Sequence, residues 1–161
     1  DVFLVKGVEK KLRSRFLLWE EGVAPCVVFE FLSPSTRRRD LSYKPARYAS
    51  LGVKEYYAFD PSGTWIEGKL RCYRLKGRRL VPVRDRFSPE LGVELRVDGD
   101  WLRLVKDGRV LPTASEERRR ADAEARKARA EARRADAAVR RVRELEAEIA
   151  RLKGLGEGRP E

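Results

Sequence analysis

The chain has 161 residues, of which 39% are charged, and a formal net charge of +11. It contains no His, Asn, Gln or Met. Without His it cannot hold a Ser-His-Asp triad, a zinc–histidine site or a histidine-based nuclease centre. Any metal site would have to use Asp and Glu, which select a hard cation such as Mg²⁺. Most of the positive excess lies before residue 111, which favours a polyanionic partner over a generic basic surface.

Compartment and redox state follow from what the sequence lacks. No apolar run approaches the roughly 20 residues of a membrane span, and no signal-peptide pattern opens the chain, so we expect a cytoplasmic location and no membrane partner. Cys26 and Cys72 stand alone, which fits two half-buried small hydrophobic residues better than a disulfide framework or a metal knuckle. The chain opens with Asp and has no Met, so we expect an N-terminal part of the domain to be missing.

Two apolar strands are predicted in the first third of the chain. Residues 1–5 form a short buried strand that opens with the carboxylate of Asp1, and Gly7 ends it. Pro25 precedes a second strand, residues 26–32, whose nearly continuous apolar run indicates burial on both faces, as in a central strand. Its one charge, Glu30, needs a partner because an unpaired buried carboxylate is costly.

A loop and a helix are predicted next. Ser33 to Thr36 form a loop by composition. Asp40 or Ser42 can cap a helix that runs to about Leu51. Four residues of this helix recur at spacings of three and four and therefore share one face: Lys44, Arg47, Tyr48 and Leu51.

The rest of the globular part is predicted to be β-structure. Its expected strands cover residues 55–60, a hairpin of 70–75 with 80–83, and a last pair of 93–97 with 101–105. Strand, strand, helix, strand and hairpins predict a mixed α/β (α+β) fold, in a domain of residues 1–111.

After Pro112 the composition changes to mostly Ala, Arg and Glu. Thr113 or Ser115 can cap a helix over residues 112–153, and residues 154–161 are predicted to be a flexible tail. A seam with alternating steps of four and three consists of Ala121, Ala125, Ala128, Ala132, Ala135, Val139 and Val142, and it continues after one shortened step with Leu145, Ile149 and Leu152. We interpret it as a dimerising coiled coil; the alternative is a lone charged helix in solvent.

Three side chains could build a metal-dependent phosphodiesterase centre. Cleavage of a phosphodiester with Mg²⁺ needs carboxylates about one ion and a nearby cation or base. Asp1 and Glu30 supply the carboxylates if their strands are neighbours, and Lys44 supplies the cation from the helix that follows. The competing interpretation is structural, with Glu30 simply paired to Lys44 or Arg47.

Other polar residues near this trio could bind nucleic acid. Those expected to face the phosphate backbone are Arg37, Arg38, Arg39 and Arg47. Ser33 and Ser35 could hydrogen-bond to phosphate or to metal-bound water, with Asp40 and Tyr48 as supporting residues.

The string from Cys26 to Pro61 resembles the signature of the Uma-two family of restriction-endonuclease-like proteins, typified by vEvlSpStrrrDlxxKxxxYxxxGVxEYWlvDP. The matching positions include Glu30, Ser33, Asp40, Lys44, Tyr48, Gly52, Glu55 and Asp60. Residues 1–5 resemble the PD-V strand that precedes this signature, and the resemblance extends to about Leu104. A charged, Ala-rich C-terminal helix is also frequent in the family.

The resemblance implies a PD-(D/E)XK-type nuclease, with a mixed sheet flanked by helices and a magnesium-dependent site. By position, Asp1 is the acid of the PD half and Glu30 the acid of the (D/E)XK half. The third position of that half is Leu32, so Lys44 is the implied migrated lysine. The family's upstream helix with a glutamate has no counterpart here. We therefore expect a homodimeric endonuclease that hydrolyses DNA with Mg²⁺ or Mn²⁺. The alternative is a non-catalytic nucleic-acid-binding or assembly module with a coiled-coil dimerisation helix.

Overall fold

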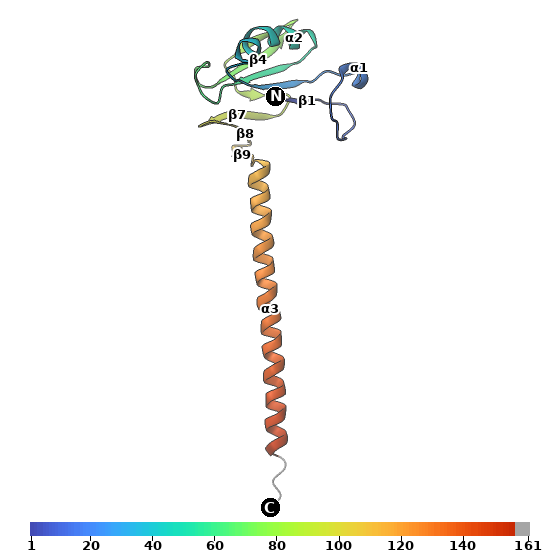
Figure 1. Ribbon diagram of the computed structural model, residues 1–161, viewed down its shortest axis with the longest axis vertical. Coiled ribbons are helices and arrows are strands. Elements are labelled where there is room, and N and C mark those ends of the chain that lie inside the picture. Colours follow the sequence, from blue (N-terminus) through green and yellow to red (C-terminus); the bar gives the residue numbers. More distant parts are fainter. Residues whose placement is uncertain (157–161) are drawn as a thin grey trace, which may run out of the picture. The chain divides into compact units, whose positions relative to one another are not determined.

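The computed structural model divides the chain into two compact units, Asp1–Leu111 and Pro112–Glu161. It describes the backbone of residues 1–156 and the side chains as far as Leu152 (Figure 1). No helix in that part of the chain is long and apolar enough to cross a membrane.

A five-stranded mixed sheet forms the centre of the first unit. In spatial order its strands are β1 (Val2–Leu4), β2 (Val27–Phe31), β3 (Glu55–Phe59), β4 (Leu70–Lys76) and β5 (Arg79–Val83). β2 and β3 are parallel, and every other neighbouring pair is antiparallel. A parallel pair needs a long crossover connection, and here that crossover carries the helix predicted to run from Asp40 or Ser42 to about Leu51. The predicted mixed α+β fold is confirmed.

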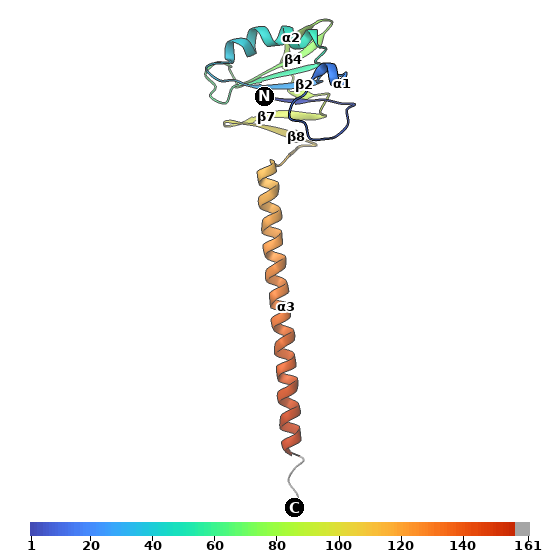
Figure 2. The same ribbon diagram turned by 45° about the vertical axis from the view of Figure 1, so that its right-hand side comes forward.

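A smaller antiparallel sheet covers one face of the first. It consists of β6 (Phe87–Ser88), β7 (Val93–Asp98), β8 (Trp101–Lys106) and β9 (Arg109–Val110). Tyr57 and Phe59 of β3 share an apolar cluster with Leu95 of β7. Tyr56 and Ala58, which alternate with them, belong to the cluster under the helix. Figure 2 accordingly shows the helix and the smaller sheet on opposite sides of the central sheet.

The crossover helix starts earlier and is less regular than predicted. Helical backbone begins at Arg37, passes through a π-helical turn, η1 (Arg39–Tyr43), and continues as α2 (Lys44–Ser50). The predicted cap at Asp40 or Ser42 is wrong, because both residues lie inside the helical segment. Asp40 turns inward instead and is 1% exposed.

The π turn leaves one carbonyl for a partner outside the helix. The Lys44 N–H donates to the Arg39 carbonyl, five residues back. The next bond of that kind would run from Pro45 to the Asp40 carbonyl, but proline has no N–H. The Tyr56 hydroxyl donates to that carbonyl instead, at 2.7 Å. Since buried carbonyls need a partner, this bond from β3 stabilises the turn that carries Asp40 and Lys44.

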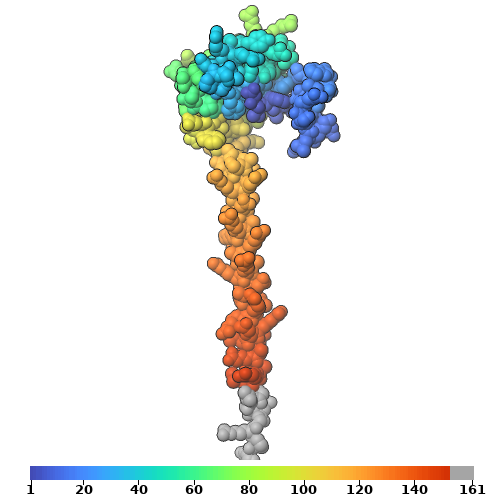
Figure 3. Space-filling view, viewed as in Figure 1, coloured from blue at the N-terminus to red at the C-terminus, as the bar shows by residue number. Residues whose placement is uncertain are grey.

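The segment before β2 is mostly irregular. Its one helix, α1 (Leu18–Glu21), is a single turn that ends at Gly22, whose φ of 70° is left-handed. The space-filling view in Figure 3 shows this N-terminal part, coloured blue, protruding beside the rest of the domain.

The second unit is one long helix, α3 (Ala114–Gly156). The Glu116 N–H donates to Thr113 Oγ1 at 3.2 Å, and the Glu116 carboxylate accepts the Thr113 N–H at 2.7 Å. This capping box confirms Thr113 as the predicted cap. Residues 154–156 of the predicted tail are helical, and the remainder, 157–161, lies outside the described residues.

Candidate active site

Glu30 lies near the end of β2, on the face of the central sheet that α2 covers. Its neighbours on that face, Val28 and Leu32, belong to the apolar cluster beneath the helix. Glu30 itself is 0% exposed. A carboxylate in such a place requires hydrogen-bonding partners, because desolvating an unpaired charge is costly.

Both carboxylate oxygens of Glu30 receive a partner from α2. Lys44 Nζ donates to Oε2 at 2.6 Å, and the Tyr48 hydroxyl donates to Oε1 at 3.0 Å. Lys44 and Tyr48 are four residues apart and therefore project from the same face of the helix. Burial, together with the negative charge of Glu30, raises the pKa of Tyr48 to about 12, so the phenol remains a donor at neutral pH.

Lys44 bridges three carboxylates. Its Nζ lies 2.6 Å from Glu30 Oε2, 2.7 Å from Asp40 Oδ1 and 3.5 Å from Asp1 Oδ2. Partial burial lowers the pKa of Lys44, but the contacts with Asp40 and Glu30 raise it by more, so that it lies above its ordinary value. The lysine is therefore charged and neutralises carboxylates that the core would otherwise hold unpaired.

Asp40 has a more central position than the supporting role expected for it. Its Oδ1 forms the ion pair with Lys44, and its Oδ2 accepts no hydrogen bond from any residue that the structure describes. A buried oxygen without a protein donor is expensive to keep, so this oxygen calls for a further partner such as an ordered water or a cation. The sequence signal was present: Asp40 and Lys44 are four residues apart, a spacing that places both on one helical face.

Asp1 stands opposite Glu30 at the edge of the sheet. β1 pairs antiparallel with β2, with Val2 opposite Phe29. The next opposed pair is therefore Asp1 and Glu30, whose side chains point to the same face. The predicted neighbourhood of these two strands is confirmed. With its side chain 55% exposed, Asp1 is the open member of the cluster.

Leu32 occupies the strand position where the resemblance places the usual lysine. It lies on the same face as Glu30, is 6% exposed and packs in the core. The ammonium that meets Glu30 comes instead from Lys44, on the helix that follows.

A pocket of about 410 Å³ opens beside this cluster. Its lining residues are Arg39, Tyr43, Lys44, Arg47 and Tyr48. Arg39 and Arg47 are exposed, and neither has an ion-pair partner among the described residues. Guanidinium groups without a carboxylate partner, next to an ammonium, form a pocket suited to phosphate.

The other residues predicted to bind nucleic acid have different surroundings. The Arg37 guanidinium lies over the Trp65 ring, 5.2 Å from its centroid. The Ser33 hydroxyl lies 3.2 Å from that of Ser35, within their own turn. Arg38 is exposed and does not line the pocket beside the cluster. The structure thus places Arg39 and Arg47 at the pocket beside the acid–lysine cluster, but not Arg37, Arg38, Ser33 or Ser35.

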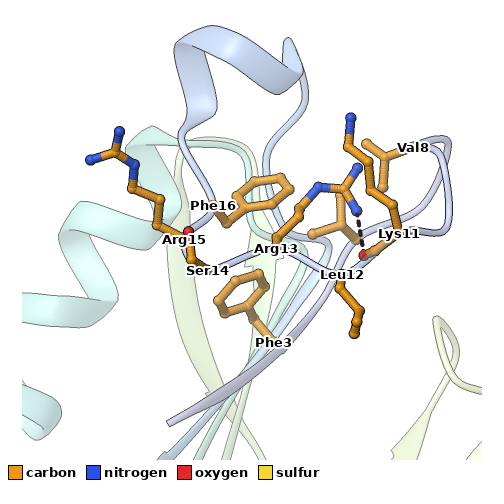
Figure 4. Close-up of a pocket in the computed structure, with 9 residues that line it drawn as sticks. Phe3, Val8, Lys11, Leu12, Arg13, Ser14, Arg15 and Phe16 are labelled. Carbon is orange, nitrogen blue, oxygen red and sulfur yellow. Dashed lines mark hydrogen bonds between the residues drawn. The ribbon is translucent and has the colours of Figure 1, made fainter.

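A larger pocket, about 460 Å³, lies between β1 and the irregular N-terminal segment. Figure 4 shows the rings of Phe3 and Phe16 in it, and their centroids are 5.4 Å apart. Its lining includes Lys11, Arg13 and Arg15 but no carboxylate. The smaller pocket is the better candidate for the active site, because Lys44 and Tyr48 of its lining contact the Glu30 carboxylate, a ligand suited to a hard cation.

The acid cluster suits a hard divalent cation. Asp1 and Glu30 are opposed by extension of the β1–β2 register and offer only oxygen ligands, and Asp40 Oδ2 has no hydrogen-bond donor among the described residues. No group of three or more Asp, Glu or Cys side chains in the described part of the chain is arranged to hold a metal by itself. Mg²⁺ keeps several of its waters and is commonly bound by one or two carboxylates. The residues therefore fit a two-carboxylate site, provided that the Lys44 ammonium moves off Glu30.

Fold and site together define a mixed α+β domain with a buried acid–lysine cluster beside a basic pocket. A family model described as "Putative restriction endonuclease" matches residues 1–105, and the chain belongs to this family, Uma2. No curated protein matches the chain. The resemblance predicted from the string around Glu30 is thereby confirmed. Membership indicates a nuclease, a hydrolase that acts on nucleic acid, and restriction-endonuclease-like families generally use divalent metal ions.

Proposed function

We propose that this protein is a Mg²⁺-dependent endonuclease that hydrolyses phosphodiester bonds of DNA. The observation that carries the proposal is the position of Lys44 Nζ, 2.6 Å from Glu30 and 3.5 Å from Asp1. Two carboxylates and a cation meet on one face of the sheet, beside two arginines that pair with no carboxylate in the described part of the chain. Metal-assisted hydrolysis of a phosphodiester can use this set of groups, with carboxylates to hold the ion and cations to bind the phosphate.

Asp1 and Glu30 are the proposed metal ligands. Bound Mg²⁺, or Mn²⁺ in its place, would polarise the phosphate and lower the pKa of a bound water. Tyr48 holds Glu30 Oε1 at 3.0 Å, which fixes the carboxylate in one orientation. Ligand carboxylates held by such outer hydrogen bonds keep their geometry better than free ones.

Lys44 is the proposed catalytic cation. Its ammonium has a second anchor in Asp40, at 2.7 Å, so it can leave Glu30 and remain in place. From there it would orient the attacking water and stabilise the negative charge that develops on the phosphate oxygens. Asp40 is then a positioning residue that acts through Lys44.

Arg39 and Arg47 are proposed to bind backbone phosphates next to the one that is cut. Both line the pocket beside Lys44, and arginine binds phosphate oxygens in a bidentate manner. Contacts of Arg37, Arg38, Ser33 and Ser35 with the same backbone remain part of the proposal as the outer edge of this surface. α3 is proposed to join two copies of the chain.

A second candidate function is a non-catalytic nucleic-acid-binding module. One observation favours it: the Lys44 ammonium already fills the space between three carboxylates. A lysine that only neutralises buried acids is a structural element of the core. The basic pocket would then bind phosphate without cutting.

The test is cleavage of supercoiled plasmid by the full chain with Mg²⁺ or Mn²⁺. We expect nicking by the wild type, none by Glu30→Gln, and wild-type rates for Glu94→Gln, which changes an exposed carboxylate on β7. Circular dichroism checks that each variant is folded. Binding without nicking by the wild type would support the module, and nicking that persists in folded Glu30→Gln would overturn the assignment.

A further inference from the structure

Five large apolar side chains in the second half of α3 are exposed. They are Val139 at 52%, Val142 at 53%, Leu145 at 42%, Ile149 at 52% and Leu152 at 58%. No residue that the structure describes covers them, and every described side chain from Glu117 onward in this helix is exposed. An apolar stripe along a helix is normally buried against another element, so this stripe indicates a partner.

The spacing of the stripe defines a heptad. Counting in sevens, position a is occupied by Ala135, Val142 and Ile149, and position d by Ala138, Leu145 and Leu152. In this register Val139 falls at e, beside the seam. The shortened step after Val142 is the point where the alanine seam predicted upstream changes to this register.

The residue types at a and d determine the preferred number of helices. In parallel coiled coils, β-branched residues at a with leucine at d favour two strands. We propose that residues 135–152 pair with the same segment of a second copy of this chain as a parallel two-stranded coiled coil. This proposal specifies the dimer proposed above: it gives the heptad register, the parallel orientation of the two helices, and the residues between which they pair.

Charge at the flanking positions agrees with the parallel arrangement. In a parallel pair, a g residue lies next to the e residue five positions later in the other helix. Arg141 is at g and Glu146 at e, so each helix would offer an attractive pair to the other.

The same heptad cannot continue toward the start of α3. It would place Glu117, Glu124 and Glu131 at d, where carboxylates from two helices would face each other across the seam and repel. The strong contact is therefore confined to residues 135–152. Upstream, only the alanine seam is left, which buries little apolar area.

A parallel pair has a consequence for the nuclease. It brings the starts of both α3 helices to the same end, so both acid–lysine clusters are attached there. This step rests on the proposed function: two centres would then be available for the two strands of one duplex.

The orientation is tested by disulfide formation in the full chain. In a parallel, in-register coil each d residue faces its own counterpart, so Leu152→Cys should form a linked dimer under mild oxidation. In an antiparallel coil residue 152 lies beside the start of the partner's segment, and this link does not form. Ala147→Cys at the outward position f is the matched control. The wild type gives the background, because Cys26 and Cys72 are buried.

The register is tested by light scattering without metal or nucleic acid. We expect a dimer for the wild type and for Val139→Lys, and a monomer for Leu145→Lys with unchanged helical content. Any of three outcomes would overturn the proposal. The wild type could be a monomer, or Val139→Lys could disrupt the dimer more than Leu145→Lys does. The third is that Ala147→Cys forms the disulfide as efficiently as Leu152→Cys. A dimer without plasmid cleavage would leave the coil intact and count only against the nuclease.

Discussion

Lys44 Nζ lies 2.6 Å from Glu30 Oε2 and joins the helix after β2 to a carboxylate that is 0% exposed. The same ammonium lies 2.7 Å from Asp40, so one lysine pairs with two buried acids. The lysine neutralises both acids in this structure, and in the proposed mechanism a metal ion on Glu30 would release it toward the substrate.

Removing the lysine should destabilise the domain and abolish cleavage. Lys44→Met leaves Glu30 and Asp40 buried without a cation, and breaking a buried ion pair typically costs about 3–5 kcal/mol. Urea unfolding at pH 7 measures this loss, and the exposed Lys106→Met is the control. A loss no larger than that of the control would mean that the cluster is not held as described. Lys44→Arg, which keeps the charge, should recover most of the stability.

Asp40→Asn should separate positioning from metal binding. The substitution keeps the shape but removes the charge that holds Lys44, and loss of such an outer contact costs about 10–100-fold in activity. We expect the plasmid-nicking rate to fall by this factor while the Mn²⁺ affinity, measured by calorimetry, changes little. An unchanged nicking rate would show that Asp40 has no part in catalysis. A loss of Mn²⁺ affinity as large as the loss of rate would indicate that Asp40 is a metal ligand.

Tyr56→Phe should weaken the π turn. The phenol of Tyr56 donates to the Asp40 carbonyl at 2.7 Å, and a buried carbonyl left without a donor costs about 1–3 kcal/mol. Tyr73→Phe is the matched control on the neighbouring strand, since its hydroxyl makes no hydrogen bond to a described residue. Equal effects of the two substitutions on the free energy of unfolding would contradict this role of the bond.

Lowering the pH should reduce the free energy of unfolding of the domain, in part because the Glu90 carboxylate becomes protonated. Hydrogen bonds from Lys54 and Lys6 lower the pKa of the Glu90 carboxyl, against the opposing effect of burial. A carboxylate with a depressed folded pKa stabilises the protein above its unfolded pKa, about 4.3 for glutamate, and loses that contribution as pH falls through the folded value. Between pH 6 and pH 3 the unfolding free energy of Glu90→Gln should therefore decline less than that of the wild type. Glu94→Gln should follow the wild type; a decline in Glu90→Gln as steep as in the wild type would rule this contribution out.

Arg39 and Arg47 should account for part of the salt dependence of DNA binding. Each phosphate contact contributes about 0.9 to the slope of log affinity against log salt concentration. The double alanine variant should bind with a slope lower by about two such contributions, measured by fluorescence anisotropy with Ca²⁺ in place of Mg²⁺. Arg109→Ala, on β9, is the control. An unchanged slope would place the DNA elsewhere on the domain.

The central strands could be predicted because their apolar runs are local, and the family string located Glu30 and Lys44. The irregular start of the helix could not be predicted from the local sequence. Its π turn depends on the hydroxyl of Tyr56 on β3, which is sixteen residues from Asp40 in the sequence. Capping preferences favour Asp at a helix start and so predict a cap at Asp40, whereas Asp40 lies inside the helical segment and is buried. β6 and β9 were missed because two-residue strands carry no periodic pattern.

The central claim, that Asp1 and Glu30 hold a metal ion in place of Lys44, is tested most directly by an anomalous diffraction map of crystals grown with Mn²⁺. We expect one Mn²⁺ peak between the carboxylates of Asp1 and Glu30, with the Lys44 ammonium moved off Glu30 and still on Asp40. The claim would be contradicted if crystals with saturating Mn²⁺ showed no peak between Asp1 and Glu30 and Lys44 were still paired with Glu30.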